Sequence, residues 1–110
     1  MITADTIKGA YDALIEANEN QFGAEEGRIE AAQAREKAYV EAMDEALNDG
    51  ITDQMRIQKK AEKATRKQLT ALHLKEKASR KAQHQYRQAG ILVDSLNRQL
   101  EAEKLNGQRG

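Results

Sequence analysis

The sequence predicts an all-α protein, built as an antiparallel, coiled-coil-like helical hairpin that assembles into a helical bundle. The 110 residues contain no proline, although average usage would place about five in a chain of this length. Strong helix formers such as Ala, Glu, Lys, Gln and Arg dominate the composition instead. The strongest break is Asn48-Asp49-Gly50, which divides the chain almost in half and carries residues that commonly end helices. We therefore expect one helical domain, residues 1–110, with two long arms.

The first arm is expected over about residues 4–48. Apolar residues recur there in alternating steps of three and four, which is the spacing of one helix face. Gly23 and Gly27 weaken the helix near its middle, so two helices over about 4–22 and 25–48 are the alternative. The expected contact face of this arm consists of Tyr11, Ile15, Asn18, Phe22, Ile29, Ala32, Glu36, Tyr39, Met43 and Ala46.

The turn is expected at residues 48–52, and the second arm at about residues 53–105. Thr52 or Asp53 offers the N-cap of this arm, because both side chains accept hydrogen bonds from a helix's first free amide groups. The apolar pattern is thinner here and drifts from one face to the next. The expected contact face of the second arm consists of Ile57, Ala61, Ala64, Ala71, Leu72, Ala78, Ala82, Tyr86, Ala89, Val93, Leu96 and Leu100.

Two nearly equal arms joined by a short turn favour an antiparallel hairpin. Facing residue numbers would then add to about 100, which places Ile29 opposite Ala71. A compact three-helix bundle, bent at Gly23 and broken again at Gly90, is the competing arrangement. Since a lone two-helix hairpin leaves one side of each arm uncovered, we expect a homo-oligomer, most simply a dimer that forms a four-helix bundle.

The zero net charge is the sum of two halves of opposite sign. Residues 1–50 carry 12 acidic and 4 basic side chains, and residues 51–110 carry 6 acidic and 14 basic ones. Opposite signs favour folding the arms against one another. Within the second arm, basic residues recur at helical spacing and define the candidate binding surface for a partner or a nucleic acid: Lys59, Lys60, Lys63, Arg66, Lys67, Lys77, Arg80 and Lys81.

This basic stripe has three interpretations. It can bind an acidic surface of a protein partner, or it can contact nucleic-acid phosphates with a strong dependence on salt. The third interpretation is purely structural: the stripe is a solvated face neutralised by acidic residues of the first arm, namely Glu36, Glu41, Asp44 and Glu45. Aromatic residues are not interleaved with the basic ones and no recognition motif occurs, which favours the purely structural interpretation. If the stripe does bind, we expect a protein partner rather than a nucleic acid. A mirror hypothesis holds that carboxylates of the first arm imitate phosphates.

Features typical of enzymes are sparse in this sequence. There is no cysteine, and the only histidines are His73 and His84, which lie about 16 Å apart along one helix and cannot share a metal ion. No glycine-rich phosphate loop, nucleophile elbow or calcium loop occurs. We expect a non-enzymatic protein without catalytic residues, metal or cofactor.

The hydropathy pattern predicts no membrane segment. No apolar run approaches the roughly 20 residues that span a bilayer, and MITADTIKGA lacks the basic and apolar blocks of a signal peptide. We expect a cytoplasmic protein without membrane contact.

The two arms together carry a resemblance to a group of known proteins. An Ala, Glu and Arg-rich arm ends in EALNDGI and is followed by the Lys and Gln-rich segment QKKAEKATRKQL, with Ile51, Lys60 and Ala61 as the chief identities. This layout resembles small helical-hairpin accessory proteins of tailed phages and prophages. The resemblance implies a non-enzymatic protein that acts in the host cytoplasm. We expect a coiled-coil protein that presents a charged helical surface to a macromolecular partner, with nucleic-acid binding as the alternative.

Overall fold

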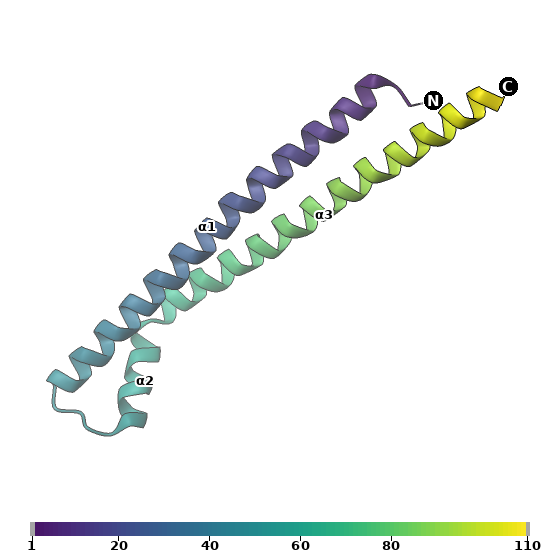
Figure 1. Ribbon diagram of the computed structural model, residues 1–110. Coiled ribbons are helices and arrows are strands. Elements are labelled where there is room, and N and C mark those ends of the chain that lie inside the picture. The colour runs from purple at the N-terminus through teal and green to yellow at the C-terminus, as the bar shows by residue number, and fades with distance from the viewer. Residues whose placement is uncertain (1, 110) are drawn as a thin grey trace. The chain divides into compact units, whose positions relative to one another are not determined.

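The computed structural model describes residues 2–109, nearly all of which lie in three helices (Figure 1). Helix α1 spans Ala4–Asn48, α2 spans Gln54–Ala64 and α3 spans Arg66–Arg109. These residues include no β-strand. The predicted all-α fold class is therefore confirmed.

The helices contribute to two compact units. Unit 1 contains the part of α1 up to Gly23 and the part of α3 from Arg80 onward, and unit 2 contains Ala24–Ser79. Within unit 1, the two helical segments are joined by a hydrogen bond from Asn97 Nδ2 to the Tyr11 hydroxyl oxygen, at 3.2 Å.

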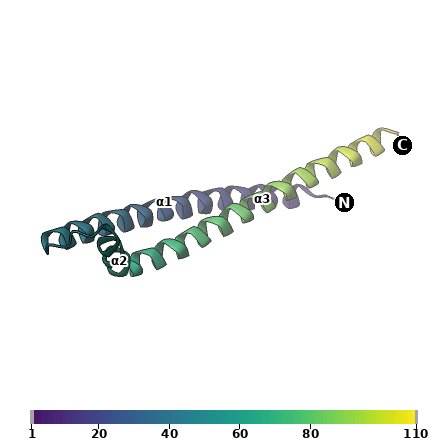
Figure 2. The same cartoon turned by 90° about the horizontal axis from the view of Figure 1, so that it is seen from below.

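Unit 2 contains an antiparallel helical hairpin with α2 at its turn (Figures 1 and 2). The Ser79 hydroxyl donates a hydrogen bond to Glu25 on α1, at 3.0 Å, and Lys60 Nζ lies 3.2 Å from Asp49 Oδ2. A residue later in α1 therefore contacts a residue earlier in the returning part of the chain, so the two parts run antiparallel. The predicted hairpin is confirmed in this respect.

The reversal after α1 is built on one glycine. Gly50 has a φ of +84°, a left-handed conformation that costs residues with a Cβ atom roughly 1–2 kcal/mol. The amide of Gly50 donates to the Leu47 carbonyl at 3.0 Å, and the amide of Ile51 donates to the Ala46 carbonyl at 3.1 Å. This pair of bonds is the Schellman arrangement, which satisfies two of the free carbonyl groups at a helix end. The expected turn therefore has a clear local cause.

Helix α2 begins at a side-chain cap and ends at a threonine. Asp53 is the N-cap, and its Oδ1 accepts the amide of Met55 at 3.1 Å, as one of the two predicted residues should. Thr65 ends the helix: its backbone leaves the helical region (φ −105°, ψ 14°) while its amide and hydroxyl both donate to the Ala61 carbonyl. The Thr65 carbonyl in turn accepts the amide of Leu69 at 3.0 Å, so α3 starts at once.

This corner corrects the expected extent of the arms. The sequence predicted one continuous second arm at about residues 53–105, whereas the structure has two helices separated at Thr65. Conversely, the helices run without interruption through Gly23, Gly27 and Gly90. A break at these glycines is therefore not observed, and the three-helix bundle bent at Gly23 and Gly90 is not the fold. The break therefore falls at a buried threonine and not at a glycine.

The contact face of α1 agrees with the prediction near the turn, where Ala46 is buried and Tyr39 and Met43 are half-buried, but differs in the first half of the helix. Tyr11, Ile15 and Phe22 were expected to pack inward, but 42%, 57% and 63% of their surfaces are exposed. The inward positions lie one residue earlier in the sequence, about 100° around the helix. They form a seven-residue repeat of alanines that are buried or half-buried, namely Ala10, Ala17, Ala24, Ala31 and Ala38. Because alanine is small, helix backbones can approach closely along such a face.

The contact face of the second arm was predicted with mixed success. Ile57, Ala61, Ala82 and Val93 are buried as expected. Ala64, Ala71 and Ala78 are exposed instead, whereas Leu72 is half-buried as predicted. The inward face of α3 in unit 2 also includes Gln68, Leu69, Glu76 and Ser79. Gly27 lies beside Lys75 and Glu25 bonds Ser79, so facing residue numbers add to 102 and 104, close to the predicted sum of about 100, although Ile29 and Ala71 are themselves exposed.

Candidate basic interaction surface

The corner at Thr65 determines how the basic residues of unit 2 are presented. Thr65 is buried, with only 2% of its surface exposed, and it joins the last turn of α2 to the first turn of α3. Lys63 belongs to that last turn of α2, and Arg66 and Lys67 open α3. Three basic residues are thereby held within five positions around a fixed corner.

Two open hollows adjoin this corner. Lys63, Ala64, Arg66, Lys67 and Thr70 line the larger one, which has a volume of about 730 Å³. The second hollow, of about 530 Å³, shares Lys63 and Arg66 with the first and extends to Lys59, Glu62, Leu69 and Arg35. The structure therefore gathers four predicted residues, Lys59, Lys63, Arg66 and Lys67, around adjoining hollows. We call these four residues and Arg35 the basic cluster.

Arg35 on α1 was missed by the sequence analysis. Its guanidinium carbon lies 5.4 Å from the centroid of the Tyr39 ring, a cation–π distance. The Nε atom of Arg35 is buried and has no hydrogen-bond partner in the described part of the chain. The signal that could have found Arg35 is its place within the alanine repeat, because it lies between Ala31 and Ala38 on the inward face of α1.

The remaining predicted basic residues lie outside the basic cluster. Lys60 is exposed and forms a salt bridge with Asp49 across the turn, at 3.2 Å. Lys77 lies about 15 Å further along α3 than Lys67, since a helix rises 1.5 Å per residue. Arg80 and Lys81 are exposed residues of unit 1. The predicted stripe is thus divided between the two units, and only its first part gathers at the corner.

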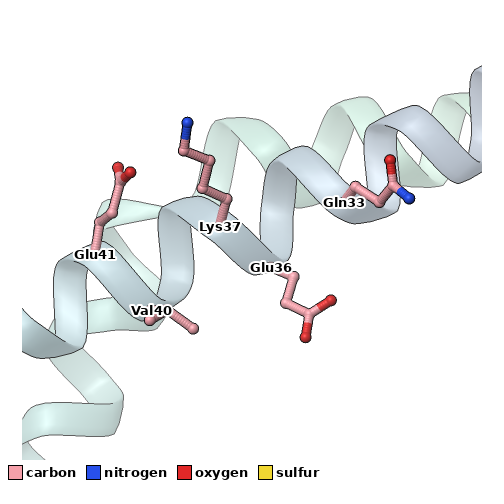
Figure 3. Close-up of a pocket in the computed structure, with 5 residues that line it drawn as sticks. All are labelled: Gln33, Glu36, Lys37, Val40 and Glu41. Atoms are coloured by element: carbon pink, nitrogen blue, oxygen red, sulfur yellow. The ribbon is translucent and has the colours of Figure 1, made fainter.

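The acidic residues expected to neutralise the stripe do not form ion pairs with it. Among the described side chains, salt bridges join Lys60 to Asp49 and Arg28 to Glu25. Neither salt bridge involves Glu36, Glu41, Asp44 or Glu45. Of these four residues, Glu36 and Glu41 line the hollow drawn in Figure 3. The purely structural interpretation of the stripe is therefore not supported by direct contacts.

The local electrostatics strengthen the positive potential of the corner. Residues 54–70 contain six basic side chains and one acidic one, Glu62. The first turn of α3 contains no acidic residue, so no carboxylate of that turn offsets the charges of Arg66 and Lys67. An anionic group is accordingly the complementary ligand for this surface.

A separate hollow on α1 has a different character. It is lined by Gln33, Glu36, Lys37, Val40 and Glu41, all of which come from one helix, with Lys37 and Glu41 projecting to one side of it and Glu36 and Val40 to the other (Figure 3). The side chains do not converge on a common point. This hollow is therefore an undulation of the helix surface and offers no organised site.

One carboxylate has a perturbed proton affinity. Arg28 donates hydrogen bonds to Glu25, with its Nε 3.1 Å from both carboxylate oxygens, and Ser79 donates another. These bonds, that of Arg28 first, lower the pKa of the Glu25 carboxyl below its ordinary value. Glu25 therefore remains ionised and links α1 to α3 within unit 2.

The histidines and acidic residues do not gather into a metal-binding group. No cluster of three or more His, Cys, Asp or Glu side chains occurs in the part of the chain that the structure describes. His73 and His84 are both exposed and belong to different units. None of the described helices is both long and apolar enough to span a bilayer.

With this geometry established, the chain was compared with known proteins. No family model, curated protein or solved structure matches it. The basic cluster is therefore interpreted from its own residues, and the resemblance to phage hairpin proteins stays a prediction.

Proposed function

We infer that this chain is a non-enzymatic helical interaction protein that uses its basic cluster to bind an acidic surface of a protein partner. The observation that carries the proposal is the convergence of Lys63, Arg66 and Lys67 on one open hollow, with no carboxylate paired to any of them in the described structure. Unpaired charges that face one opening attract a ligand of opposite charge.

The form in which the protein acts is part of the same proposal. A homo-oligomer, with the dimer favoured, presents two basic clusters and multiplies the strength of weak contacts. A cytoplasmic location, in the host cytoplasm if the chain is encoded by a phage, agrees with the sequence pattern and with the phage resemblance.

Nucleic-acid binding is the second candidate function. The observation in its favour is the position of Arg66 and Lys67 in the first turn of α3, where the free amide groups and the helix dipole also favour phosphate. The exposed basic residues further along the chain, Lys77, Arg80 and Lys81, supply additional positive charge for an extended polyanion.

A binding titration separates these proposals. The probes are a fluorescent polyglutamate peptide, which represents an acidic protein surface, and a fluorescent duplex DNA. Replacing Lys63, Arg66 and Lys67 by Gln should weaken polyglutamate binding on the order of tenfold or more, because each exposed pair contributes roughly 0.2–1 kcal/mol. The matched control replaces Lys8, Lys37 and Lys104 by Gln, which changes the net charge equally at sites outside the cluster.

The outcome of the titration assigns the function. Preference for polyglutamate, lost in the cluster variant and kept in the control, supports the protein partner. Preference for DNA, with log K falling against log salt by about 0.9 per phosphate contact, supports the nucleic-acid alternative. Absence of binding to both probes at low salt would overturn both.

A further inference from the structure

Several bulky apolar residues of unit 1 lie on its surface, although Val93 is buried and Leu14, Leu96 and Leu100 are half-buried. On α1, Tyr11, Ile15 and Phe22 occupy one face at spacings of four and seven residues. On α3, Ile91 and Leu105 are exposed by 61% and 56%. The buried apolar positions of unit 1 are occupied by the smaller residues Ala10, Ala82 and Val93, and none of the described large side chains is fully buried. Unit 1 therefore leaves most of its hydrophobic material uncovered.

The exposed face of α1 lies beside the helix-to-helix contact. Each of its residues follows an inward position by one, so the face is rotated by about 100° from that contact. A helix in a four-helix bundle contacts two neighbours on adjacent sides, and this rotation suits the second neighbour. The Tyr11 hydroxyl accepts a hydrogen bond from Asn97 of the same chain, and 42% of the Tyr11 surface remains exposed beside that contact.

The complementary face of α3 combines apolar and basic residues. Arg80, Arg87, Ile91, Arg98 and Leu105 recur at spacings of seven, four, seven and seven residues, and all are exposed. Ile91 and Arg98 line an open hollow of about 380 Å³ together with Asp94, Ser95 and Gln99. An apolar side chain from outside can contact Ile91 there while the rim remains polar.

The charges that flank the two faces have opposite signs. The α1 segment of unit 1 carries Asp12, Glu16 and Glu19, and the α3 face carries the three arginines already named. None of these groups has an ion-pair partner in the described chain. Pairing α1 with α1 of a second copy would bring acidic groups together, whereas pairing α1 with α3 brings opposite charges together.

We propose that the Tyr11–Ile15–Phe22 face of α1 docks onto the Arg87–Ile91–Arg98 face of α3 in a second copy of this chain. Two-fold symmetry repeats the contact, with α3 of the first copy receiving α1 of the second. This inference rests on the oligomeric form within the proposed function, but it specifies the interface independently of the basic cluster.

Sedimentation velocity on the full chain at increasing concentrations tests the apolar part of the interface. The wild type should dimerise, and Phe22→Lys should raise the dimer dissociation constant roughly 30-fold or more, as loss of a central aromatic anchor does. Met55→Lys is the matched control, because Met55 is equally exposed at 65% but lies on α2. Its dissociation constant should not change. Circular dichroism verifies that both variants retain their helices.

A charge-exchange experiment tests which helices meet. Variant A carries Asp12→Lys and Glu19→Lys, and variant B carries Arg87→Glu and Arg98→Glu. Each alone should dimerise weakly, because like charges meet in both contacts. A mixture should restore the dimer, since both contacts then pair opposite charges. A dimeric wild type that is unaffected by Phe22→Lys, or a mixture without recovery, would overturn the interface alone. A monomeric wild type would also remove the oligomer from the proposed function, while polyglutamate binding remains a separate result.

Discussion

Filling the closest helix contact of unit 2 should destabilise the protein measurably. Ala61 on α2 is completely buried, and its carbonyl accepts both hydrogen bonds that end the helix. The substitution Ala61→Leu adds three carbon atoms where the structure leaves no exposed surface. Overpacking of this kind costs about 1–3 kcal/mol. With a urea m-value of about 1–3 kcal/mol/M, a loss of 2 kcal/mol lowers the unfolding midpoint by roughly 1 M.

The control for this prediction lies one turn further along the same helix. Ala64 is exposed, so Ala64→Leu makes the same chemical change without entering the contact. Leu and Ala have similar helix propensities. The free energy of unfolding should therefore change by less than about 0.5 kcal/mol. Urea unfolding followed by far-ultraviolet circular dichroism measures both variants. Equal midpoints for the two variants, or a more stable Ala61→Leu protein, would refute the close packing at Ala61.

Three other changes test local features. Gly50→Ala should lose roughly 1–2 kcal/mol in urea unfolding, because alanine must adopt the left-handed conformation of the turn; an unchanged midpoint would mean that the turn relaxes. Gly23→Ala should instead gain about 0.5–1 kcal/mol in the same assay, since α1 is continuous there and nothing lies within 4 Å of the added methyl group. The Glu25 carboxyl should titrate below its ordinary pKa of 4.5 in an NMR titration, and Ser79→Ala should raise that pKa part of the way. Because the folded-state pKa is the lower one, ionised Glu25 stabilises the fold above about pH 4.5, and this stabilisation is lost as the pH falls through the folded-state pKa. A Glu25 carboxyl that titrates at its ordinary pKa would contradict its hydrogen bonds to Arg28 and Ser79.

The turn and its caps could be predicted from sequence because their causes are local. Gly50 supplies a backbone conformation that other residues adopt at a cost, and Asp53 supplies the acceptor that the first turn of α2 needs. The inward positions Ala82 and Val93 were also found, since the apolar pattern of that part of α3 has one dominant face. In each case a few neighbouring residues contain the necessary information.

The contact face of α1 was wrong at Tyr11, Ile15 and Phe22 because hydropathy ranks residues by size as well as by polarity; at the other end of the helix, Ala46 is buried as predicted. Tyr11 and Phe22 gave a stronger apolar signal than Ala10 and Ala17, yet the smaller residues form the contact. Close approach of two helices depends on how little space their side chains require, which a hydropathy pattern does not describe. The seven-residue alanine repeat was the signal that could have corrected the prediction.

The corner at Thr65 could not be predicted from turn residues. No glycine or proline marks it, and its neighbours are strong helix formers. The helix ends at Thr65, whose backbone leaves the helical region while its side chain is buried. The same reason limits the prediction of the candidate surface. Lys63, Arg66 and Lys67 were predicted as basic residues of the surface, but the sequence did not predict that the corner at Thr65 brings them to one hollow.

The central claim for α1 in unit 2 is that a small residue, Ala46, lies in the helix contact while the bulkier Val40 lies on the surface. The chain has no cysteine, so single-cysteine variants report accessibility through their rate of reaction with a thiol reagent. Val40→Cys and Ala46→Cys both lie on α1 within unit 2, with 51% and 0% of the native side chains exposed. In native buffer, Val40→Cys should react at nearly the rate of the urea-unfolded protein, and Ala46→Cys at least about tenfold more slowly, because its reaction requires local opening. The reverse order of rates would show that the bulky face packs inward and would contradict the account.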